Sequence, residues 1–116
     1  MDFEVCPSLL ACDFAYHADE IRAVEAAGAD WLHCDVMDGQ FVPNLSLGVP
    51  IVEAAKRTAS VPLDVHLMIV EPTRFAESFA RAGAKRITFH IETIGTTDAA
   101  ASVAAAAKHI RGLGCS

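Results

Sequence analysis

Two short runs of sequence decide the fold of this chain: residues 31–37, WLHCDVM, and residues 61–68, VPLDVHLM. Each run predicts a β-strand, in which successive side chains point to opposite faces. In the first run His33, Asp35 and Met37 share one face, and the residues between them are apolar. The second run repeats this arrangement. The sequence therefore predicts strands that each have one apolar and one polar face.

Strand-like runs alternate with helix-like runs along the whole chain. Pro50 and Pro72 suit the first turn of a helix, and Gly28 and Gly83 suit helix ends. This alternation indicates βαβ units and a parallel sheet. We expect strands at residues 4–10, 31–37, 61–68 and 86–91, and helices at residues 17–27, 50–57 and 72–82, with a fourth helix between a cap at Thr97 or Asp98 and a stop at Gly112.

An internal echo repeats the step from helix to strand. Residues 27–33, AGADWLH, match residues 82–88, AGAKRIT, in their order of helix end, Ala-Gly-Ala and strand. Repetition of one βα unit fits a (βα)8 barrel and a doubly wound sheet equally well. The echo alone does not choose between these folds.

A polar face shared by three neighbouring strands separates the two folds. The echo puts Thr88, His90 and Glu92 on the face equivalent to that of His33 and Asp35. An open parallel sheet covered by helices needs apolar residues on both faces, whereas a barrel active site gathers polar residues at the C-terminal ends of its strands. The polar face therefore favours the TIM (βα)8 barrel, an α/β fold.

The composition is that of a globular domain. The chain has 116 residues, of which 53% are hydrophobic and 21% charged, and its formal net charge is −6. This length predicts one domain, residues 1–116. The nine Lys and Arg residues form no cluster, which argues against a nucleic-acid surface or a polybasic membrane patch. No apolar run approaches the roughly 20 residues that span a bilayer.

Cysteine usage indicates a reducing compartment. The four cysteines show no CxxC spacing, and the first residues lack the basic and apolar regions of a signal peptide. We therefore expect reduced thiols and a cytoplasmic location. The cysteines are Cys6, Cys12, Cys34 and Cys115.

His33, Asp35 and His66 form a candidate metal site. Residues two apart on a strand lie roughly 6.5 to 7 Å apart, and the next strand lies about 4.8 Å away. Two imidazoles and a carboxylate can therefore converge on one divalent cation, and this donor set suits Zn²⁺, Fe²⁺, Mn²⁺ or Co²⁺. The alternative is that each histidine is a hydrogen-bonded core residue. Two histidines and an aspartate on one face favour the metal.

Further residues of the polar face have open or indirect roles. Met37 and Met68 lie at its outer end, where they either fill the core or face a substrate. The loop over residues 38–48 is long for a connection from strand to helix, and long loops at that rim are often functional. Asp64 lies too deep in its strand to be an obvious ligand, so we expect it to orient the ligands instead.

Three segments closely resemble the ribulose-phosphate 3-epimerase family. They are residues 7–14, PSLLACDF, residues 33–44, HCDVMDGQFVPN, and residues 63–68, LDVHLM. The Ala-Gly-Ala steps follow the family in order as well, so that the resemblance extends from Val5 to Cys115. It implies a TIM-barrel isomerase of the pentose phosphate pathway, which interconverts D-ribulose 5-phosphate and D-xylulose 5-phosphate through a cis-enediolate.

The resemblance also implies roles for individual residues. The residues matching His33, Asp35 and His66 bind a catalytic divalent metal in the family, commonly zinc or iron. Asp35 by the same match is the proton acceptor. The substrate is a small sugar phosphate, and the residues matched to its contacts are Ser8, Met37, His66 and Met68.

Part of the family's apparatus is absent from this sequence. The second catalytic carboxylate, the fourth metal ligand and the Gly-rich phosphate loops belong to the second half of the barrel. The chain supplies about the first four of the eight βα units that the fold needs. We therefore expect residues 1–116 to be the N-terminal half of a ribulose-phosphate-binding TIM barrel.

Two alternatives remain beside the ribulose-phosphate epimerase. An allulose-6-phosphate 3-epimerase shares the HxDxMDG and HLM patterns and differs most in substrate contacts that the absent half would carry. The other alternative is a half-barrel that binds metal or assembles with a partner and catalyses nothing. Open strand edges and an uncovered polar sheet face favour a homo-oligomer.

Overall fold

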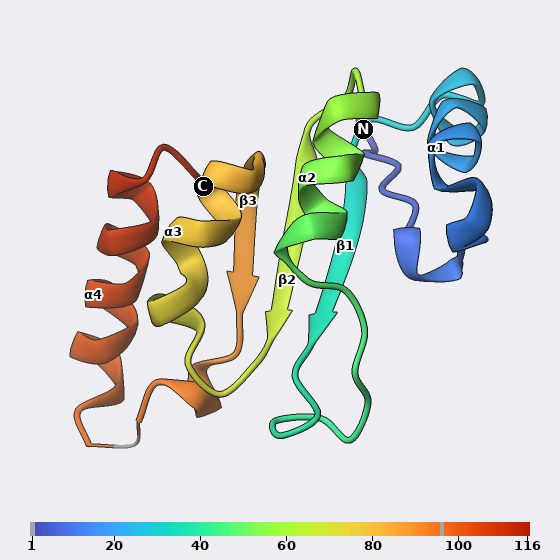
Figure 1. Cartoon of the computed structure of the whole chain (residues 1–116). Coiled ribbons are helices and arrows are strands. Elements are labelled where there is room, and N and C mark those ends of the chain that lie inside the picture. The colour runs from blue at the N-terminus through green and yellow to red at the C-terminus, as the bar shows by residue number, and fades with distance from the viewer. Residues whose placement is uncertain (1, 96) are drawn as a thin grey trace.

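The computed structural model describes residues 2–95 and 97–116 and shows an α/β fold (Figure 1). Three parallel strands form one sheet in the order β1-β2-β3, which confirms the predicted parallel sheet. The strands are β1 (Leu32–Met37), β2 (Leu63–Met68) and β3 (Ala84–Phe89). The helices are α1 (His17–Ala26), α2 (Val49–Thr58), α3 (Pro72–Ala82) and α4 (Ala99–Gly112), with one-turn 3₁₀ helices at Leu9–Ala11, Phe14–Tyr16 and Ile91–Thr93.

Local signals set the helix ends. Pro50 and Pro72 lie in the first turns of α2 and α3, where the N–H that proline lacks would be unpaired. Gly83 ends α3 with a φ of 119°, a left-handed conformation that favours glycine. Asp98 caps α4 by accepting a hydrogen bond from the Ala101 N–H. No helix in the described part of the chain is long and apolar enough to cross a membrane.

The strand register gathers the polar side chains on one face of the sheet. Asp35 lies opposite His66 in the β1–β2 pair, and His66 lies opposite Thr88 in the β2–β3 pair. Met37 and Met68 lie opposite each other where β1 and β2 end. The predicted polar face is therefore a continuous surface across the strands.

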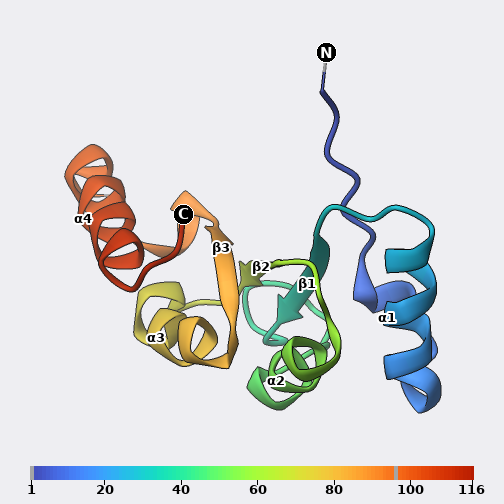
Figure 2. The same ribbon diagram turned by 90° about the horizontal axis from the view of Figure 1, so that it is seen from above.

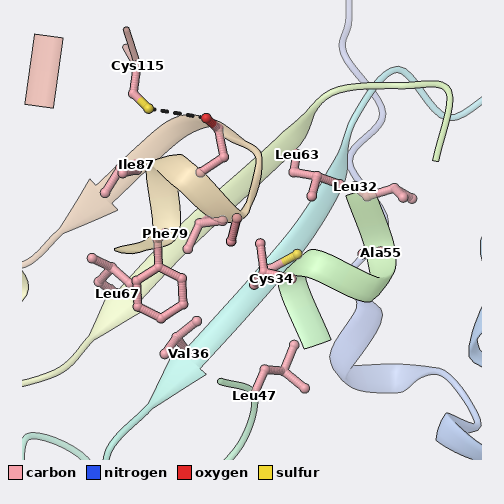
Figure 3. Close-up of a cluster of buried hydrophobic side chains, with 14 of the residues drawn as sticks. Leu32, Cys34, Val36, Leu47, Ala55, Leu63, Leu67, Phe79, Ile87 and Cys115 are labelled. Carbon is pink, nitrogen blue, oxygen red and sulfur yellow. Dashed lines mark hydrogen bonds between the residues drawn. The ribbon is translucent and has the colours of Figure 1, made fainter. Parts of the chain in front are cut away.

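The other face of the sheet forms the hydrophobic core. Figure 2 shows α2 and α3 on one side of the sheet, with α1 and α4 beyond its two edges. The alternate side chains of the strands are buried against these helices (Figure 3). Residues of this core include Leu32, Cys34, Val36, Val52, Ala55, Leu63, Val65, Leu67 and Phe79.

The four cysteines are all free thiols, as their spacing predicts. Cys34 and Cys115 are buried, and Cys6 and Cys12 are partly exposed. Burial, reinforced by the nearby carboxylates of Asp64 and Asp35, raises the pKa of Cys34 to about 12. This thiol therefore belongs to the core and stays protonated at neutral pH.

The predicted first strand at residues 4–10 is wrong, so the described part of the chain has three strands instead of four. The segment runs extended beside β1: the Val5 carbonyl accepts hydrogen bonds from the Asp30 and Trp31 N–H groups just before the strand, and the Pro7 carbonyl accepts one from the His33 N–H within it. One isolated bridge joins Ser8 to His33. Because Pro7 has no N–H to return to β1, a regular ladder cannot form at this point.

The predicted strand at residues 86–91 is displaced. Strand β3 begins and ends two residues earlier, because Gly83 ends α3 directly before it and leaves no intervening loop. A 3₁₀ turn at Ile91–Thr93 then follows. His90 consequently lies just beyond the end of β3, and Glu92 lies in the turn.

One further residue, Ser116, pairs with the outer edge of β3. The Ser116 N–H donates to the Lys85 carbonyl at 3.0 Å, and the Ile87 N–H donates to the Ser116 carbonyl at 2.9 Å. Two such bonds to residues two apart are the pattern of a parallel neighbour. Ser116 therefore pairs with the outer edge of β3 in the manner of a parallel neighbour.

Candidate functional site

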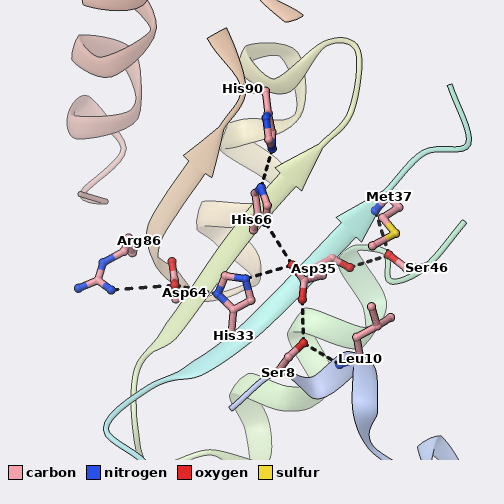
Figure 4. Close-up of polar contacts among 10 residues, drawn as sticks. All are labelled: Ser8, Leu10, His33, Asp35, Met37, Ser46, Asp64, His66, Arg86 and His90. Atoms are coloured by element: carbon pink, nitrogen blue, oxygen red, sulfur yellow. Dashed lines mark hydrogen bonds and ion pairs between the residues drawn. The ribbon is translucent and has the colours of Figure 1, made fainter. Parts of the chain in front are cut away.

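Three side chains converge on the polar face of the sheet. His33 and Asp35 project from β1 and His66 from β2 (Figure 4). One donor atom of each lies within 4.8 Å of the donor atoms of the other two. The pairing of Asp35 with His66 in the strand register creates this convergence, so it rests on rigid elements. The structure thus brings the three predicted metal ligands together.

Asp35 is the centre of the cluster. Its Oδ1 lies 3.1 Å from His33 Nε2 and 3.1 Å from His66 Nδ1. Its Oδ2 accepts a hydrogen bond of 2.7 Å from the Ser8 hydroxyl. Both carboxylate oxygens therefore have partners, and these contacts fix the orientation of the side chain.

The surroundings of Asp35 favour its ionised form. Burial raises the pKa of this carboxyl, but the hydrogen bond from Ser8, the charge of His33 and hydrogen bonds from both histidines lower it by more. The net effect is a pKa below the ordinary aspartate value. Asp35 is therefore a carboxylate at neutral pH, which is the form that binds a cation or accepts a proton.

The second nitrogen of each histidine also has a partner. His33 Nδ1 lies 2.9 Å from Asp64 Oδ2, and His66 Nε2 lies 2.7 Å from His90 Nε2. Arg86 stands behind Asp64, with 4.0 Å between its Nη1 and Asp64 Oδ2. Asp64 therefore contacts a candidate ligand, as the sequence led us to expect.

The residues matched to substrate contacts lie around the cluster. Ser8 approaches from the extended segment beside β1, held by its bridge to His33. Met37 and Met68 lie partly exposed on the same face, one strand position beyond the pairing of Val36 with Leu67. The methionines therefore border the cluster on the side where the strands end.

The long loop after β1 is tied to the site by Ser46, which carried no sequence signal, and to the next loop by Asp38, which lies in the motif of residues 33–44. The Ser46 hydroxyl donates to the Asp35 carbonyl at 2.6 Å and accepts from the Met37 N–H at 2.9 Å. Asp38 accepts hydrogen bonds from the N–H groups of Gln40, Phe41 and Val70, which joins this loop to the next one. A serine in an aperiodic loop gives no pattern from which such a contact could be predicted.

The three candidate ligands are partly buried. A cavity of about 400 Å³ lies elsewhere, between the loop after β1 and the start of α3, where Val49, Ile69 and Phe75 help to line it. Its lining includes none of the three candidate ligands. We place the chemistry at the cluster, because its donor atoms converge and the cavity lining is mainly apolar.

Comparison with a family model and with curated proteins gives matches to ribulose-phosphate 3-epimerases. Residues 4–116 match the model of the Ribulose-phosphate 3 epimerase family. The chain is 54% identical over 88 residues to the ribulose-phosphate 3-epimerase of Synechocystis, and 56% identical over 88 residues to that of Mycobacterium tuberculosis. Each match covers 76% of this chain and 38% of the relative. The matched part of the chain therefore spans about two fifths of the length of these curated relatives.

A solved structure shares the fold at low sequence identity. The 7,8-dihydropteroate synthase of Vibrio fischeri superposes with a TM-score of 0.56 at 17% identity. The match covers 89% of this chain and 42% of that one. This arrangement of strands and helices therefore also occurs as part of a larger chain.

Proposed function

We propose that this chain, which belongs to the ribulose-phosphate 3-epimerase family, supplies the metal-binding part of an enzyme that interconverts D-ribulose 5-phosphate and D-xylulose 5-phosphate. The observation that carries the proposal is the convergence of His33, Asp35 and His66 on the polar sheet face. These residues lie within the segment that aligns with relatives of this activity.

The three residues fit one divalent cation. Two imidazole nitrogens and a carboxylate oxygen are a common donor set for zinc and iron, and they also accept manganese or cobalt. Protein groups behind both histidines support such a set, since ligating histidines usually hydrogen-bond through their second nitrogen. A bound cation would polarise the ketone of the substrate and so make the neighbouring carbon more acidic.

Asp35 takes the proton in this scheme. Inversion at a carbon next to a ketone requires that a base remove the proton from one side, that the electron pair stay on the substrate, and that an acid return a proton from the other side. Asp35 is ionised, and Ser8 and the two histidines hold it in place. Ser8, His66, Met37 and Met68 then surround the substrate.

The acid on the opposite side and the phosphate site are proposed to come from a second half of the barrel. Three observations support this division. The 88 residues that match the Synechocystis relative cover 38% of its length, and no helix within the described residues covers the polar face (Figure 2). The Ser116 backbone pairs with β3 as a further parallel strand would. We thus propose that the chain is the N-terminal half of a TIM barrel.

A reconstitution experiment tests the proposed function. Zinc and iron binding to the chain is measured first, and then turnover of ribulose 5-phosphate after addition of a polypeptide that carries the second half of the Synechocystis relative. We expect metal-dependent turnover that is lost in Asp35→Asn and kept in Asp19→Asn, which changes an exposed helix carboxylate. Metal binding that survives His33→Ala and His66→Ala together would refute the proposal, and so would turnover that survives Asp35→Asn.

The same experiment distinguishes the other candidates. Preferential turnover of allulose 6-phosphate would identify the alternative epimerase. The open polar face and the incompletely paired outer edge of β3 also favour assembly of the chain with a second copy. Metal binding in a defined oligomer, without turnover in any combination, would identify a binding half-barrel instead of a catalytic one.

A further inference from the structure

The loop after β1 is closed on itself. The backbone of Asp38 forms an antiparallel bridge with that of Leu45, and the Gly39 N–H donates to the Asn44 carbonyl at 3.0 Å. Gly39 turns the chain with a φ of 71°, a left-handed conformation that favours glycine. Because its two ends are joined, the loop moves as one piece, and its position over the sheet depends on the contacts that anchor it.

Two side chains anchor this loop. Ser46 holds its far end to β1. Asp38 accepts hydrogen bonds through Oδ1 from the N–H groups of Gln40 and Phe41, at 2.8 and 2.9 Å, and through Oδ2 from the Val70 N–H at 2.8 Å. Val70 belongs to the loop after β2, which lies at the same end of the sheet (Figure 1). The Asp38 carboxylate therefore joins the loops of two neighbouring strands.

Hydrogen bonds hold this junction where packing does not. The cavity of about 400 Å³ lies directly behind it, and Asp38, Gln40 and Val70 are part of its lining. Atoms that border a cavity lack partners on one side, so dispersion contacts contribute less to holding the two loops together. Burial raises the pKa of Asp38, but the hydrogen bonds from the three backbone N–H groups lower it by more. The acceptor is thus a carboxylate, which binds N–H groups more strongly than a neutral oxygen does.

Phe41 extends from this loop across the sheet. Strand β2 lies between β1 and β3, yet the Phe41 ring contacts the His90 ring beyond the end of β3, with 5.0 Å between the ring centroids. His90 Nε2 in turn lies 2.7 Å from His66 Nε2. Phe41 therefore stands at the edge of the candidate metal cluster, next to a residue that contacts a candidate ligand.

We infer that Asp38 is a positioning residue, which joins the two loops so that the Phe41 ring stays beside His90 at the edge of the candidate metal site. This inference rests on the proposed function. Asp38 is not one of the three candidate ligands, and it acts through Phe41. An apolar ring at this edge limits the access of water to the cluster, which strengthens the electrostatic interactions inside it.

Asp38→Asn separates the two kinds of bond that the carboxylate makes. An amide side chain has one oxygen that accepts and one NH₂ group that only donates. The oxygen can keep the bonds from Gln40 and Phe41, but the NH₂ group then faces the Val70 N–H, donor against donor. Asp38→Asn should therefore break the link between the loops and keep the local turn, whereas Asp38→Ala should remove both.

The matched control is Asp13→Asn. Asp13 also accepts a hydrogen bond from a backbone N–H two residues later in the chain, that of Ala15 at 2.9 Å. The control makes the same chemical change in a turn on another segment. It should leave the position of Phe41 as it is in the wild type.

Bound Co²⁺ measures the position of the Phe41 ring in the chain itself. This paramagnetic ion shifts the NMR signals of nearby protons by amounts that depend on their distance and direction from the metal. We expect Asp38→Asn to change the Co²⁺-induced shifts of the Phe41 ring, and Asp38→Ala to change them further. Met37, whose N–H is held by Ser46, should keep its shifts, and the Co²⁺ affinity should stay that of the wild type.

This measurement separates positioning from a merely structural role. A residue that only stabilises the fold would lower the unfolding temperature when substituted, without moving the Phe41 ring relative to the metal. Unchanged Phe41 shifts in Asp38→Asn would overturn the inference, whatever the effect of Asp38→Ala.

Turnover in the reconstituted pair gives the second measurement. A displacement of about 1 Å at a site can cost on the order of 100-fold in rate, so we expect Asp38→Asn to lower kcat/KM for ribulose 5-phosphate by about 10- to 100-fold at saturating metal. Asp13→Asn should keep the wild-type kcat/KM. A wild-type value in Asp38→Asn would also overturn the inference.

The outcomes for the site and for the positioning residue differ. Co²⁺ binding that does not depend on His33 and His66 refutes the proposed function, and the inference with it. Co²⁺ binding through these histidines, with unchanged Phe41 shifts or unchanged kcat/KM in Asp38→Asn, keeps the proposed function and refutes only the role of Asp38. If the reconstituted pair gives no turnover, the Phe41 shifts alone decide.

Discussion

The two faces of the sheet differ in burial and in polarity, although residues of the two faces alternate along the same strands. On the face toward α2 and α3, Cys34 and Leu67 are fully buried in the core. On the other face, His33 and His66 keep about a quarter of their side-chain surface exposed and form a network of charged and polar contacts. The comparison shows how one strand can serve stability and chemistry separately, because adjacent residues face different surroundings.

The largest expected effect tests the covered face. Leu67→Ala removes a fully buried side chain from the core and should lower the free energy of unfolding by about 2–5 kcal/mol. Thr88→Ala, an exposed position on the polar face, should change it by less than about 0.5 kcal/mol. Denaturant unfolding measures both. Equal losses would contradict the division between the faces.

Metal binding tests the polar face, and the expected change in the free energy of unfolding is nearly as large. A cation at 100 times its dissociation constant should stabilise the folded chain by about 2.7 kcal/mol, and His33→Ala should abolish this gain. Cys34 is the next residue and points to the other face, where it is fully buried. Cys34→Ala should therefore lower the stability of the metal-free chain but keep the gain from metal. Thermal unfolding with and without Zn²⁺ measures both variants; loss of the metal effect in Cys34→Ala would break the comparison.

Thiol reactivity gives a smaller contrast. With a pKa of about 12, only about one Cys34 thiol in ten thousand is ionised at pH 8, and the side chain is also inaccessible. Cys6 and Cys12 are partly exposed and should be alkylated before Cys34, although burial and nearby carboxylates raise the pKa of each as well. Mass spectrometry of the alkylated native chain shows the order. Early modification of Cys34 would mean that the covered face opens.

The smallest effect concerns a contact at the rim of the core. Glu25 accepts hydrogen bonds from the Ser60 N–H and hydroxyl and from the Val61 N–H. Burial raises its pKa, but these bonds lower it by more. A carboxyl whose folded pKa is depressed contributes stability above its unfolded pKa of about 4.3, and this stability disappears as the pH falls through the folded value.

Glu25→Gln should therefore be less stable than the wild type at pH 6, by less than about 1 kcal/mol, and the two should converge toward pH 3. Glu20→Gln removes a carboxylate five residues earlier in the chain and serves as the control. Urea unfolding at a series of pH values measures the difference. A difference in the free energy of unfolding that grows as the pH falls would contradict this prediction.

Much of the fold could be predicted from local pattern. Alternation in residues 31–37 and 61–68 identified two strands and their polar faces, and Pro72 and Gly83 marked the ends of α3. The strand at residues 4–10 could not be excluded in this way, since its apolar character is strand-like. Its failure depends on Pro7 lying beside β1, where its carbonyl accepts from the His33 N–H but it has no N–H to donate in return, and this is a matter of pairing between distant segments.

The sequence by itself determined which side chains share a face and which could bind a metal, because strand periodicity acts through neighbouring residues. It also identified the family through its motifs. The tertiary structure alone decided which nitrogen of each histidine faces Asp35, and that Asp64 and His90 stand behind His33 and His66. Those contacts join residues that are 24 and 31 positions apart, and they depend on the register between strands, which no local pattern encodes.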